Sequence, residues 1–329
     1  MGISHLMSFI EHLEKGFPIF SIAKTYYEKT KQNTVLVIDS GGFYFSFFSH
    51  VNNDVFTMNE FIQKIAEINK IYHIELIFVF DGMNQLVKID ESLKRLTLQI
   101  KQNRKFFTEK GNVNDMPRGL FSGMKRTLRY LLMKHGIECV RAYSEADPII
   151  VQVAKERKAY GIVSDDSDFV LSDVFHVFGH SHFLRFYEHV IFNKKEKDPM
   201  KIGMFGYDVR DIQKYIGIQK QFYPLFCLLC GNDFTKKIAG NLRKKLNITA
   251  QYNPSKNPNE NINILTIKKV IGYLKKCKQP IPQIIEKMMN GQTDEIKNQI
   301  QMAVEQTNKM FFISTQPVNR NEIRQRIIP

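Results

Sequence analysis

Short apolar runs alternate with stretches of helical periodicity along the first half of the chain. Four runs rich in β-branched and aromatic residues have the length and composition of buried strands. These runs are residues 34–39, 75–81, 137–142 and 161–164. The first two end in an acid, Asp39 and Asp81 respectively.

Between the runs, apolar residues recur every three or four positions, which is typical of helices that bury one face. The segments with this spacing are 3–14, 57–70, 120–132 and the stretch that opens at Ser144, followed later by 211–231 and 281–313. Strands that alternate with helices predict an α/β fold with a mostly parallel twisted sheet flanked by helices. The later segments predict a helical C-terminal region.

Three segments depart from this alternation. Residues 174–192 alternate apolar and polar positions around Gly179, which predicts a hairpin. Residues 251–263 are polar and rich in Pro and Asn, which predicts a loose loop, and the last 15 or so residues favour a tail. We therefore expect a core over residues 1–234 and a basic, mostly helical region over residues 235–329.

Charge is distributed unevenly along the 329 residues. The chain has 47 Lys and Arg against 33 Asp and Glu, a net charge of +14. Residues 85–129 hold 11 basic and four acidic residues, and residues 234–278 hold 11 basic residues and one acid. Such clustering favours a polyanionic partner, either nucleic acid or an anionic membrane.

The apolar runs are all shorter than the ~20 residues that a membrane-spanning helix needs, so no membrane partner is expected. The first residues lack the charged start and apolar core of a signal peptide. We therefore expect an intracellular protein.

Cysteine and histidine give weak metal signals. Cys227 and Cys230 form a C-x-x-C inside an apolar run without a second pair, which favours core thiols over zinc ligands. A histidine metal cluster is a weaker alternative, because H-S-H lacks a recognised ligand spacing. Its members would be His176, His180, His182 and His189.

Acidic residues gather in the middle of the chain, in S-E-A-D at 144–147 and D-D-S-D at 165–168. Alone, the first reads as a capping box with Ser144 as N-cap and Asp147 at N3, and the second as a solvated turn. Together they indicate a bound cation, because crowded carboxylates raise each other's pKa. Oxygen-only ligands suit Mg²⁺ or Mn²⁺.

Seven carboxylates terminate or follow apolar segments: Asp39, Asp81, Glu145, Asp147, Asp166, Asp168 and Asp233. The carboxyl ends of parallel strands meet at one edge of a sheet, so we expect these side chains to converge there. Such a set suits two divalent cations about 3.5–4 Å apart, the arrangement used for phosphodiester cleavage.

The order of these motifs resembles the flap-endonuclease superfamily, XPG-like with a PIN-like core. The matching segments are M-G-I at 1–3, V-I-D at 37–39, V-F-D-G at 79–82, E-A-D at 145–147, D-D-S-D at 165–168 and L-C-G-N-D at 229–233. Within the superfamily the chain looks most like the Asteroid branch, through M-G-I-S-H-L-M-S-F-I-E, S-E-A-D, S-D-D-S-D-F and P-L-F-C-L-L-C-G-N-D. The likeness covers about residues 1–234.

The resemblance implies a structure-specific nuclease that uses two Mg²⁺ or Mn²⁺ ions on branched or overhanging DNA. The seven carboxylates match the metal-ligand positions of the family. We expect DNA rather than RNA as the partner, a monomer, and a nuclear location. The candidate nucleic-acid-binding residues are Gly2, Lys88, Lys94, Arg95, Arg104, Lys105, Lys236, Lys237, Arg243, Lys244 and Lys245.

Three departures from the family pattern leave an alternative open. Asp147 stands where many flap endonucleases have Glu, and Ser-Gly-Gly follows Asp39 in place of the usual Ala. The glycine-rich helix-hairpin-helix after Asp233 is missing. The chain is then either a nuclease or a nuclease-fold module that binds or scaffolds nucleic acid without cleaving it. A phosphotransfer enzyme is disfavoured, since Gly41 stands where such enzymes have a second Asp.

Overall fold

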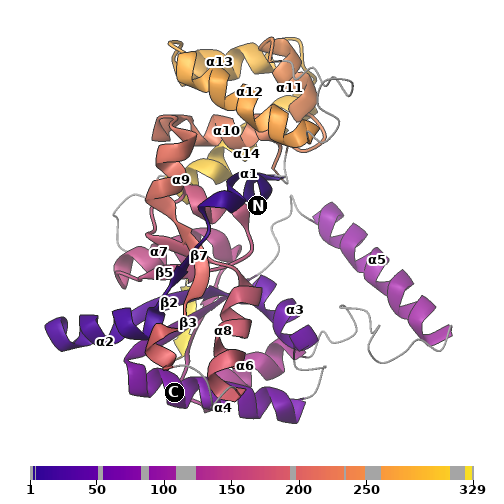
Figure 1. Cartoon of the computed structure of the whole chain (residues 1–329). Coiled ribbons are helices and arrows are strands. Elements are labelled where there is room, and N and C mark those ends of the chain that lie inside the picture. Colours follow the sequence, from indigo (N-terminus) through magenta and orange to yellow (C-terminus); the bar gives the residue numbers. More distant parts are fainter. Residues whose placement is uncertain are drawn as a thin grey trace. The chain divides into compact units, whose positions relative to one another are not determined.

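The computed structural model describes most of the chain (Figure 1). The chain divides into two compact units. The described residues are 3, 5–50, 55–82, 89–108, 124–192, 198–232, 235–248, 261–311 and 323–327. Unit 1 comprises Met1–Lys15, Asp166–Val177 and Tyr207–Thr315, and unit 2 comprises Gly16–Asp165, Phe178–Gly206 and Gln316–Pro329. The units are interleaved along the sequence, and the domain boundary expected after residue 234 stays a prediction.

Eight strands form a mixed sheet in the order β1-β7-β6-β5-β2-β3-β4-β8. They are β1 (Lys15–Phe17), β2 (Thr34–Asp39), β3 (Ile74–Phe80), β4 (Glu138–Ala142), β5 (Gly161–Val163), β6 (His176–Phe178), β7 (Met204–Asp208) and β8 (Ile323–Ile327). Strand β2 pairs in parallel with β3 and β5, and β3 pairs in parallel with β4. The predicted α/β fold is confirmed, and each of the four predicted strands lies within one residue of its observed position.

Helices flank this sheet in unit 2 and make up most of unit 1. Unit 2 contains α2 (Ile19–Thr30), α3 (Ser40–His50), α4 (Val55–Tyr72), α5 (Ile89–Thr108), α6 (Met124–Lys134), α7 (Ala146–Glu156) and α8 (His180–Phe192). Unit 1 contains α1 (Leu6–Ile10), α9 (Val209–Ile216), α10 (Tyr223–Cys230), α11 (Ala239–Lys245), α12 (Ile262–Lys276), α13 (Ile281–Met289) and α14 (Asp294–Phe311). Among the described helices, none has the combination of length and apolar character needed to cross a membrane.

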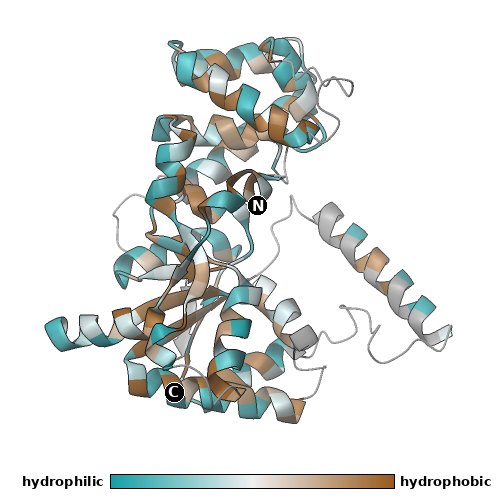
Figure 2. Cartoon of the chain, viewed as in Figure 1, coloured by the Kyte–Doolittle hydropathy of each residue, from teal (hydrophilic) through white to brown (hydrophobic). Residues whose placement is uncertain are grey.

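The strands of unit 2 are buried on both faces, as expected for parallel strands between helices. Alternate residues of β2 and β3, such as Leu36, Ile38 and Phe78, pack with α2, α3, α4, α6 and α8 in one cluster. The intervening residues, such as Val35 and Val37, belong to the other face, where α7 contacts β2 and β3. Figure 2 shows hydrophobic residues on the strands and hydrophilic residues on the outer turns of α2.

Residues 174–192 do not form the hairpin expected from the sequence. Strand β6 ends at Phe178 and α8 begins at His180. The buried side chains of α8 are spaced three and four residues apart: His180, Phe183, Leu184, Phe186, Tyr187 and Ile191. The hairpin prediction was wrong because aromatic residues on one helix face give a short stretch of apparent alternation.

The chain ends differ from expectation as well. Ile323–Ile327 forms β8, which pairs antiparallel with β4, so the tail prediction was wrong for this segment. An edge strand presents unpaired backbone groups, and β8 satisfies those of β4. At the other end, α1 covers only Leu6–Ile10, and a short 3₁₀ turn follows over Glu11–Leu13.

The loop predicted for 251–263 does not include its last two residues, since α12 begins at Ile262. The Asn261 side chain accepts a hydrogen bond from the backbone N–H of Asn263 and so caps this helix. Residues 251–260 lie outside the described residues.

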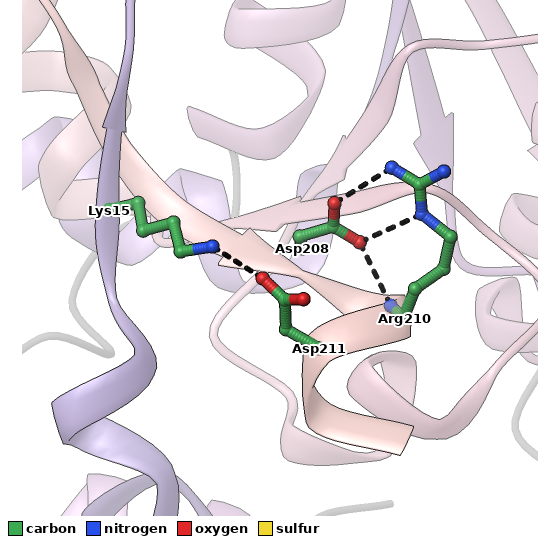
Figure 3. A network of polar contacts seen from close by, with 4 residues as sticks. All are labelled: Lys15, Asp208, Arg210 and Asp211. Carbon is green, nitrogen blue, oxygen red and sulfur yellow. Dashed lines mark hydrogen bonds and ion pairs between the residues drawn. The ribbon is translucent and has the colours of Figure 1, made fainter. Parts of the chain in front are cut away.

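Polar contacts fix the start of α9 in unit 1 (Figure 3). Asp208 is the N-cap residue, and its side chain accepts a hydrogen bond from the backbone N–H of Arg210 at 2.9 Å. The Arg210 guanidinium turns back onto the same carboxylate, at 3.1 Å and 2.8 Å. Lys15 forms an ion pair with Asp211 on the first turn of the helix. The bonds from Arg210 hold the pKa of Asp208 below its ordinary value, the hydrogen bond from the Arg210 side chain being the largest cause.

Replacement of Asp208 by Ala is expected to lower the free energy of unfolding by about 0.5–2 kcal/mol at neutral pH, the usual cost of a lost N-cap. The folded-state pKa of Asp208 is depressed, so its contribution is present above its unfolded-state pKa and is lost as the pH falls through the folded-state value. The deficit should therefore shrink below about pH 4. Urea denaturation at neutral pH and below about pH 4 tests this prediction. Asp208→Asn is the control variant, because it keeps an oxygen that can cap the helix. An equal deficit at both pH values would contradict it.

Candidate metal and nucleic-acid site

Two of the predicted ligands, Asp39 and Asp81, follow adjacent parallel strands. Asp39 is the last residue of β2 and pairs in register with Val79, and Asp81 comes directly after the end of β3. A Cβ atom added to Gly41 would lie 3.2 Å from Asp81 Oδ2 and 3.3 Å from Asp39 Oδ1. The two carboxylates therefore border one small position that the glycine leaves without a side chain.

The Asp39 carboxylate is nearly enclosed, with 9% of the residue exposed. Oδ1 accepts a hydrogen bond from the Gly41 backbone N–H, and Oδ2 accepts one from the Ser164 hydroxyl, both at 2.9 Å. Burial raises the pKa of Asp39 above its ordinary value, and the nearby Asp81 acts in the same direction. A buried carboxylate with a second carboxylate nearby, here the exposed Asp81, is stabilised by a proton or a cation.

Asp81 also connects β3 to the beginning of α7. Its Oδ1 accepts a hydrogen bond from the backbone N–H of Ala146 at 3.0 Å. The N-cap residue of α7 is Glu145, whose side chain makes no capping bond, so the capping box considered for S-E-A-D as an alternative was wrong. A side chain from a distant strand satisfies the helix terminus instead.

Glu145 and Asp147 consequently lie in the first turn of α7, where the helix dipole favours negative charge. Both carboxylate oxygens of Glu145 are inaccessible to solvent, and Asp147 is partly buried. The link from Asp81 to Ala146 places this turn next to the end of β3.

Gly82 allows the loop after β3 to approach the loop after β4. Its backbone N–H donates to the Ser144 carbonyl at 2.6 Å. A Cβ atom at this position would lie 2.2 Å from the carbonyl oxygens of both Ala142 and Tyr143. The glycine of V-F-D-G is therefore required by a close backbone contact.

Replacement of Gly82 by Ala is expected to lower the free energy of unfolding by about 1–3 kcal/mol, because the backbone of one loop must move away from the other. Gly272→Ala is the matched control. It lies within α12, where an added Cβ would meet nothing within 4 Å, and the same change should raise stability by up to about 1 kcal/mol. Urea denaturation of both variants gives the comparison, and two variants of equal stability would refute the contact argument.

In unit 1, Asp166 and Asp168 occupy a buried 3₁₀ turn over Ser167–Leu171. Asp166 is its N-cap, and Asp168 is 2% exposed. The solvated turn considered for D-D-S-D is contradicted at Ser167 and Asp168, which are buried, whereas Asp165 is exposed. The Ser167 hydroxyl accepts from the Ile3 backbone N–H at 2.7 Å and donates to the Ile3 carbonyl at 3.2 Å, which holds the N-terminal segment against the acidic motif.

The turn after α10 is closed by paired bonds between Asn232 and Thr235. The Asn232 side chain accepts from the Thr235 backbone N–H at 3.0 Å, and the Thr235 hydroxyl accepts from the Asn232 backbone N–H at 3.2 Å. Asp233 follows Asn232 and lies outside the described residues. Burial raises the pKa of the Cys227 and Cys230 thiols, in keeping with core thiols.

The structure thus brings Asp39 and Asp81 together in unit 2 and joins the start of α7 to them. Within the described ranges, no three or more His, Cys, Asp or Glu side chains form a group able to hold a metal ion. The convergence of all seven carboxylates stays a prediction. Paired carboxylate oxygens around a small open position nevertheless fit a hard divalent cation, because such cations prefer oxygen donors.

The candidate nucleic-acid-binding residues differ in their surroundings. Six of them are exposed, on α5 and around α11: Lys94, Arg104, Lys105, Lys236, Lys237 and Lys244. Two make contacts within unit 1, where the Arg243 guanidinium donates to the Leu229 carbonyl and the Lys245 ammonium donates to the Asn290 carbonyl. Burial lowers the pKa of Arg243. Gly2, Lys88 and the side chain of Arg95 lie outside the described residues.

Sequence reasoning missed the role of His180, which it considered only as a metal ligand. The residue is fully buried, with Nδ1 3.0 Å from Asp165 Oδ2 and Nε2 3.0 Å from the Asp39 carbonyl oxygen. Burial acts to raise the pKa of Asp165, but its bonds to His180 hold that pKa below the ordinary value. In the sequence, the signal for this role was the position of the histidine, directly after a predicted apolar segment and Gly179.

Comparison with known proteins bears on the same residues. Residues 136–233 match the family described as XPG I-region. The matched segment runs from β4 through α7 and the D-D-S-D turn to the end of the L-C-G-N-D motif, and so includes five of the seven predicted ligands. This match and the relatives below support the XPG-like flap-nuclease superfamily.

The curated relatives of the chain include flap endonucleases. The chain is 25% identical over 219 residues to Flap endonuclease 1 of Cryptosporidium muris, covering 64% of this chain and 43% of the relative. It is 27% identical over 196 residues to Flap endonuclease 1-B of Physcomitrium patens, covering 57% of this chain and 52% of the relative. The chain therefore spans about half the length of these relatives.

A solved structure of human GEN1 in complex with Holliday junction DNA has the same fold. The TM-score is 0.52 at 12% identity, with 100% of this chain and 69% of that chain covered. This likeness concerns the fold alone, and it agrees with the predicted flap-nuclease core.

Proposed function

We propose that the chain is a Mg²⁺-dependent, structure-specific endonuclease that hydrolyses phosphodiester bonds of DNA near single-strand junctions or overhangs. The observation that carries the proposal is the pair of carboxylates, Asp39 and Asp81, that borders one open position at the carboxyl ends of adjacent parallel strands. The XPG I-region match supports the reaction class. Mn²⁺ satisfies the same oxygen donors.

The proposed ligand set extends this pair to the acids of the same motifs. It consists of Asp39, Asp81, Glu145, Asp147, Asp166, Asp168 and Asp233. Two bound cations would supply activation of water and stabilisation of the leaving oxygen. The chain itself orients the Asp39 carboxylate through Gly41 and Ser164 and limits the access of solvent to it.

The substrate preference rests on the basic segments. The exposed lysines around α11 and the exposed basic residues of α5 supply phosphate contacts. The backbone of Phe106 and Phe107 lies in α5, and their side chains lie outside the described residues. We propose that they stack unpaired bases, each worth about 1–3 kcal/mol. The alternative is that both residues belong to a core helix. We further propose that the chain prefers DNA to RNA, acts as a monomer, belongs to the Asteroid branch and is located in the nucleus.

A second candidate function is nucleic-acid binding or scaffolding without cleavage. The replacement of Glu by the shorter Asp147 favours it, because a ligand one methylene shorter reaches less far toward a cation. Arg243 favours it too, since its guanidinium bonds the end of α10 where the family has a duplex-gripping hairpin. Cleavage assays separate the two functions.

The test compares cleavage of blunt duplex, 5′-flap, 3′-overhang and single-stranded substrates, in DNA and RNA, with Mg²⁺ and with EDTA. We expect flap and overhang DNA to be cleaved faster than blunt duplex, and no cleavage in EDTA. Equal rates on blunt and overhanging ends would remove the single-strand preference. Binding without cleavage of any substrate would favour the scaffolding function, and faster cleavage of RNA would change the substrate class.

A further inference from the structure

We infer that His180 is a positioning residue that holds Asp39 in its ligand geometry, an inference that rests on the proposed function. The imidazole lies near the carboxyl ends of two neighbouring parallel strands, β2 and β5. Its ring nitrogens contact Asp39, the last residue of β2, and Asp165, two residues after the end of β5. It touches Asp39 through the backbone carbonyl and leaves the carboxylate free for its other partners.

The ring orientation is fixed from two sides. A carbonyl oxygen can only accept, so Nε2 carries a hydrogen and donates it to the Asp39 carbonyl at 3.0 Å. On the other side, Asp165 accepts from the His180 backbone N–H through Oδ1 and contacts ring Nδ1 through Oδ2, both at 3.0 Å. Because backbone and ring of His180 bind the same carboxylate, the ring has little freedom to rotate.

Gly42 provides the space that the ring occupies. A Cβ atom at Gly42 would lie 2.5 Å from His180 Cε1 and 2.9 Å from Nδ1. Phe43 contacts the ring at 5.9 Å between centroids, with the planes 72° apart. The double glycine after Asp39, which departs from the family pattern, therefore serves two contacts: Gly41 borders the carboxylates and Gly42 admits the histidine.

The contact matters for Asp39 because this residue ends its strand. Beyond it the chain turns into α3, and the bond from His180 fixes the carbonyl orientation of Asp39 at that turn. With the carbonyl fixed, the Asp39 side chain is directed to Gly41, Ser164 and the position shared with Asp81. Without the bond, the two carboxylates lose their fixed separation, and metal affinity should fall more than stability.

Two substitutions separate the bonds that His180 makes. The amide of His180→Gln reaches the position of Nε2 and can still donate to Asp39, whereas the amide of His180→Asn reaches only Nδ1 and Asp165. We expect His180→Asn and His180→Leu to weaken Mn²⁺ binding, measured by electron paramagnetic resonance, by about 10- to 100-fold, the usual cost of losing a group that orients a ligand. His180→Gln should keep most of the affinity.

The kinetic readout should agree with the binding readout. The kcat for flap DNA is expected to fall in the Asn and Leu variants while KM for DNA is unchanged, because His180 makes no proposed contact with nucleic acid. A residue needed only to attach α8 to Asp165 would give the opposite order, with His180→Asn closer to wild type than His180→Gln.

The Gly42→Ala variant disturbs the position of the His180 ring without replacing the histidine. Its Cβ would displace the ring, so the same loss of Mn²⁺ affinity is expected from a change that removes no polar group. Thermal unfolding of each variant, with Gly272→Ala as control, reports whether the fold persists. If every variant unfolds, the wild-type chain still provides a test: the Nε2–H proton of His180 should give a slowly exchanging NMR signal, and its absence would overturn the inference.

The outcomes distinguish this inference from the function beneath it. A wild-type chain that binds no Mn²⁺ and cleaves no substrate would overturn the proposed function and this inference with it. A wild-type chain that binds and cleaves, with His180→Leu and Gly42→Ala folded and unchanged in both, would overturn only the role of His180.

Discussion

Replacement of Asp39 by Asn is expected to reduce Mg²⁺-dependent cleavage by at least about 100-fold, since even a residue that only orients a metal ligand costs up to that much. The amide has the shape of the carboxylate and retains an oxygen for the Gly41 N–H, but it removes the charge that holds a cation. Nucleic-acid binding should persist or strengthen slightly, because a negative charge near the phosphate is lost.

The folded state should tolerate this change. Asp39 is enclosed and lies near Asp81, so the substitution removes a charge from a crowded pair, and the variant is expected to be at least as stable as wild type. Asp166→Asn should lose cleavage in the same way, whereas Asp208→Asn, which alters a carboxylate bonded to Arg210, should retain it. Cleavage that survives both site substitutions, or that proceeds fully in EDTA, would exclude the two-metal mechanism.

Binding to DNA is expected to weaken steeply with salt. Each neutralised phosphate contributes a log–log slope of about −0.9 for duplex and −0.7 for single strands, so six to ten contacts cost about 10³- to 10⁵-fold between 50 and 200 mM salt. The physical basis is the +14 net charge and its concentration in two segments. A fluorescence titration at several salt concentrations measures the slope.

Substitution of the exposed lysines around α11 tests whether these residues contribute to the salt dependence of DNA binding. A triple change to Gln at Lys236, Lys237 and Lys244 should reduce the slope by about one unit for each lysine that contacts a phosphate. The matched control carries the same change at three exposed lysines outside both basic segments, Lys24, Lys29 and Lys70. Equal effects of the two triples, or an affinity independent of salt, would return the basic segments to the role of solvated surface.

The ends of β2 and β3 could be predicted from the sequence because the signal is local. A buried parallel strand is a continuous apolar run, and Asp39 and Asp81 each stand where such a run stops. Parallel pairing then requires both residues to lie at the same sheet edge, as the register shows. The boundaries of these strands and the pairing of these two acids follow from that reasoning.

The start of α7 could not be predicted in the same way. S-E-A-D fulfils the local rule for a capping box, yet the helix begins one residue later and Asp81, 65 residues away in sequence, accepts the hydrogen bond of its first turn. A sequence motif takes account only of hydrogen-bond acceptors that are near in sequence. It gives no sign of an acceptor that the tertiary fold brings in from a distant segment.

His180 illustrates a larger separation. Its ring contacts residues 15 and 141 positions away, and neither contact leaves a periodic trace in the sequence. The same region was misjudged as a hairpin because the aromatic residues of α8 hid its helical spacing. The fold was needed to identify His180, among the four histidines of this region, as the one that contacts Asp39 and Asp165.

The close contacts of two glycines give each position a distinct signature in a saturation-mutagenesis library scored separately for cellular abundance and for activity. Every substitution at Gly82 places a Cβ within 2.2 Å of main-chain oxygens that belong to the sheet edge, so all 19 alternatives should be depleted from the abundance score. At Gly42 the obstructing atoms belong to one histidine ring, and its displacement breaks side-chain hydrogen bonds but leaves the main chain in place. The Gly42→Ala variant should keep a normal abundance score and lose only its activity score. The library would therefore separate residues needed for the fold at the sheet edge from residues needed only for the geometry of the metal ligands.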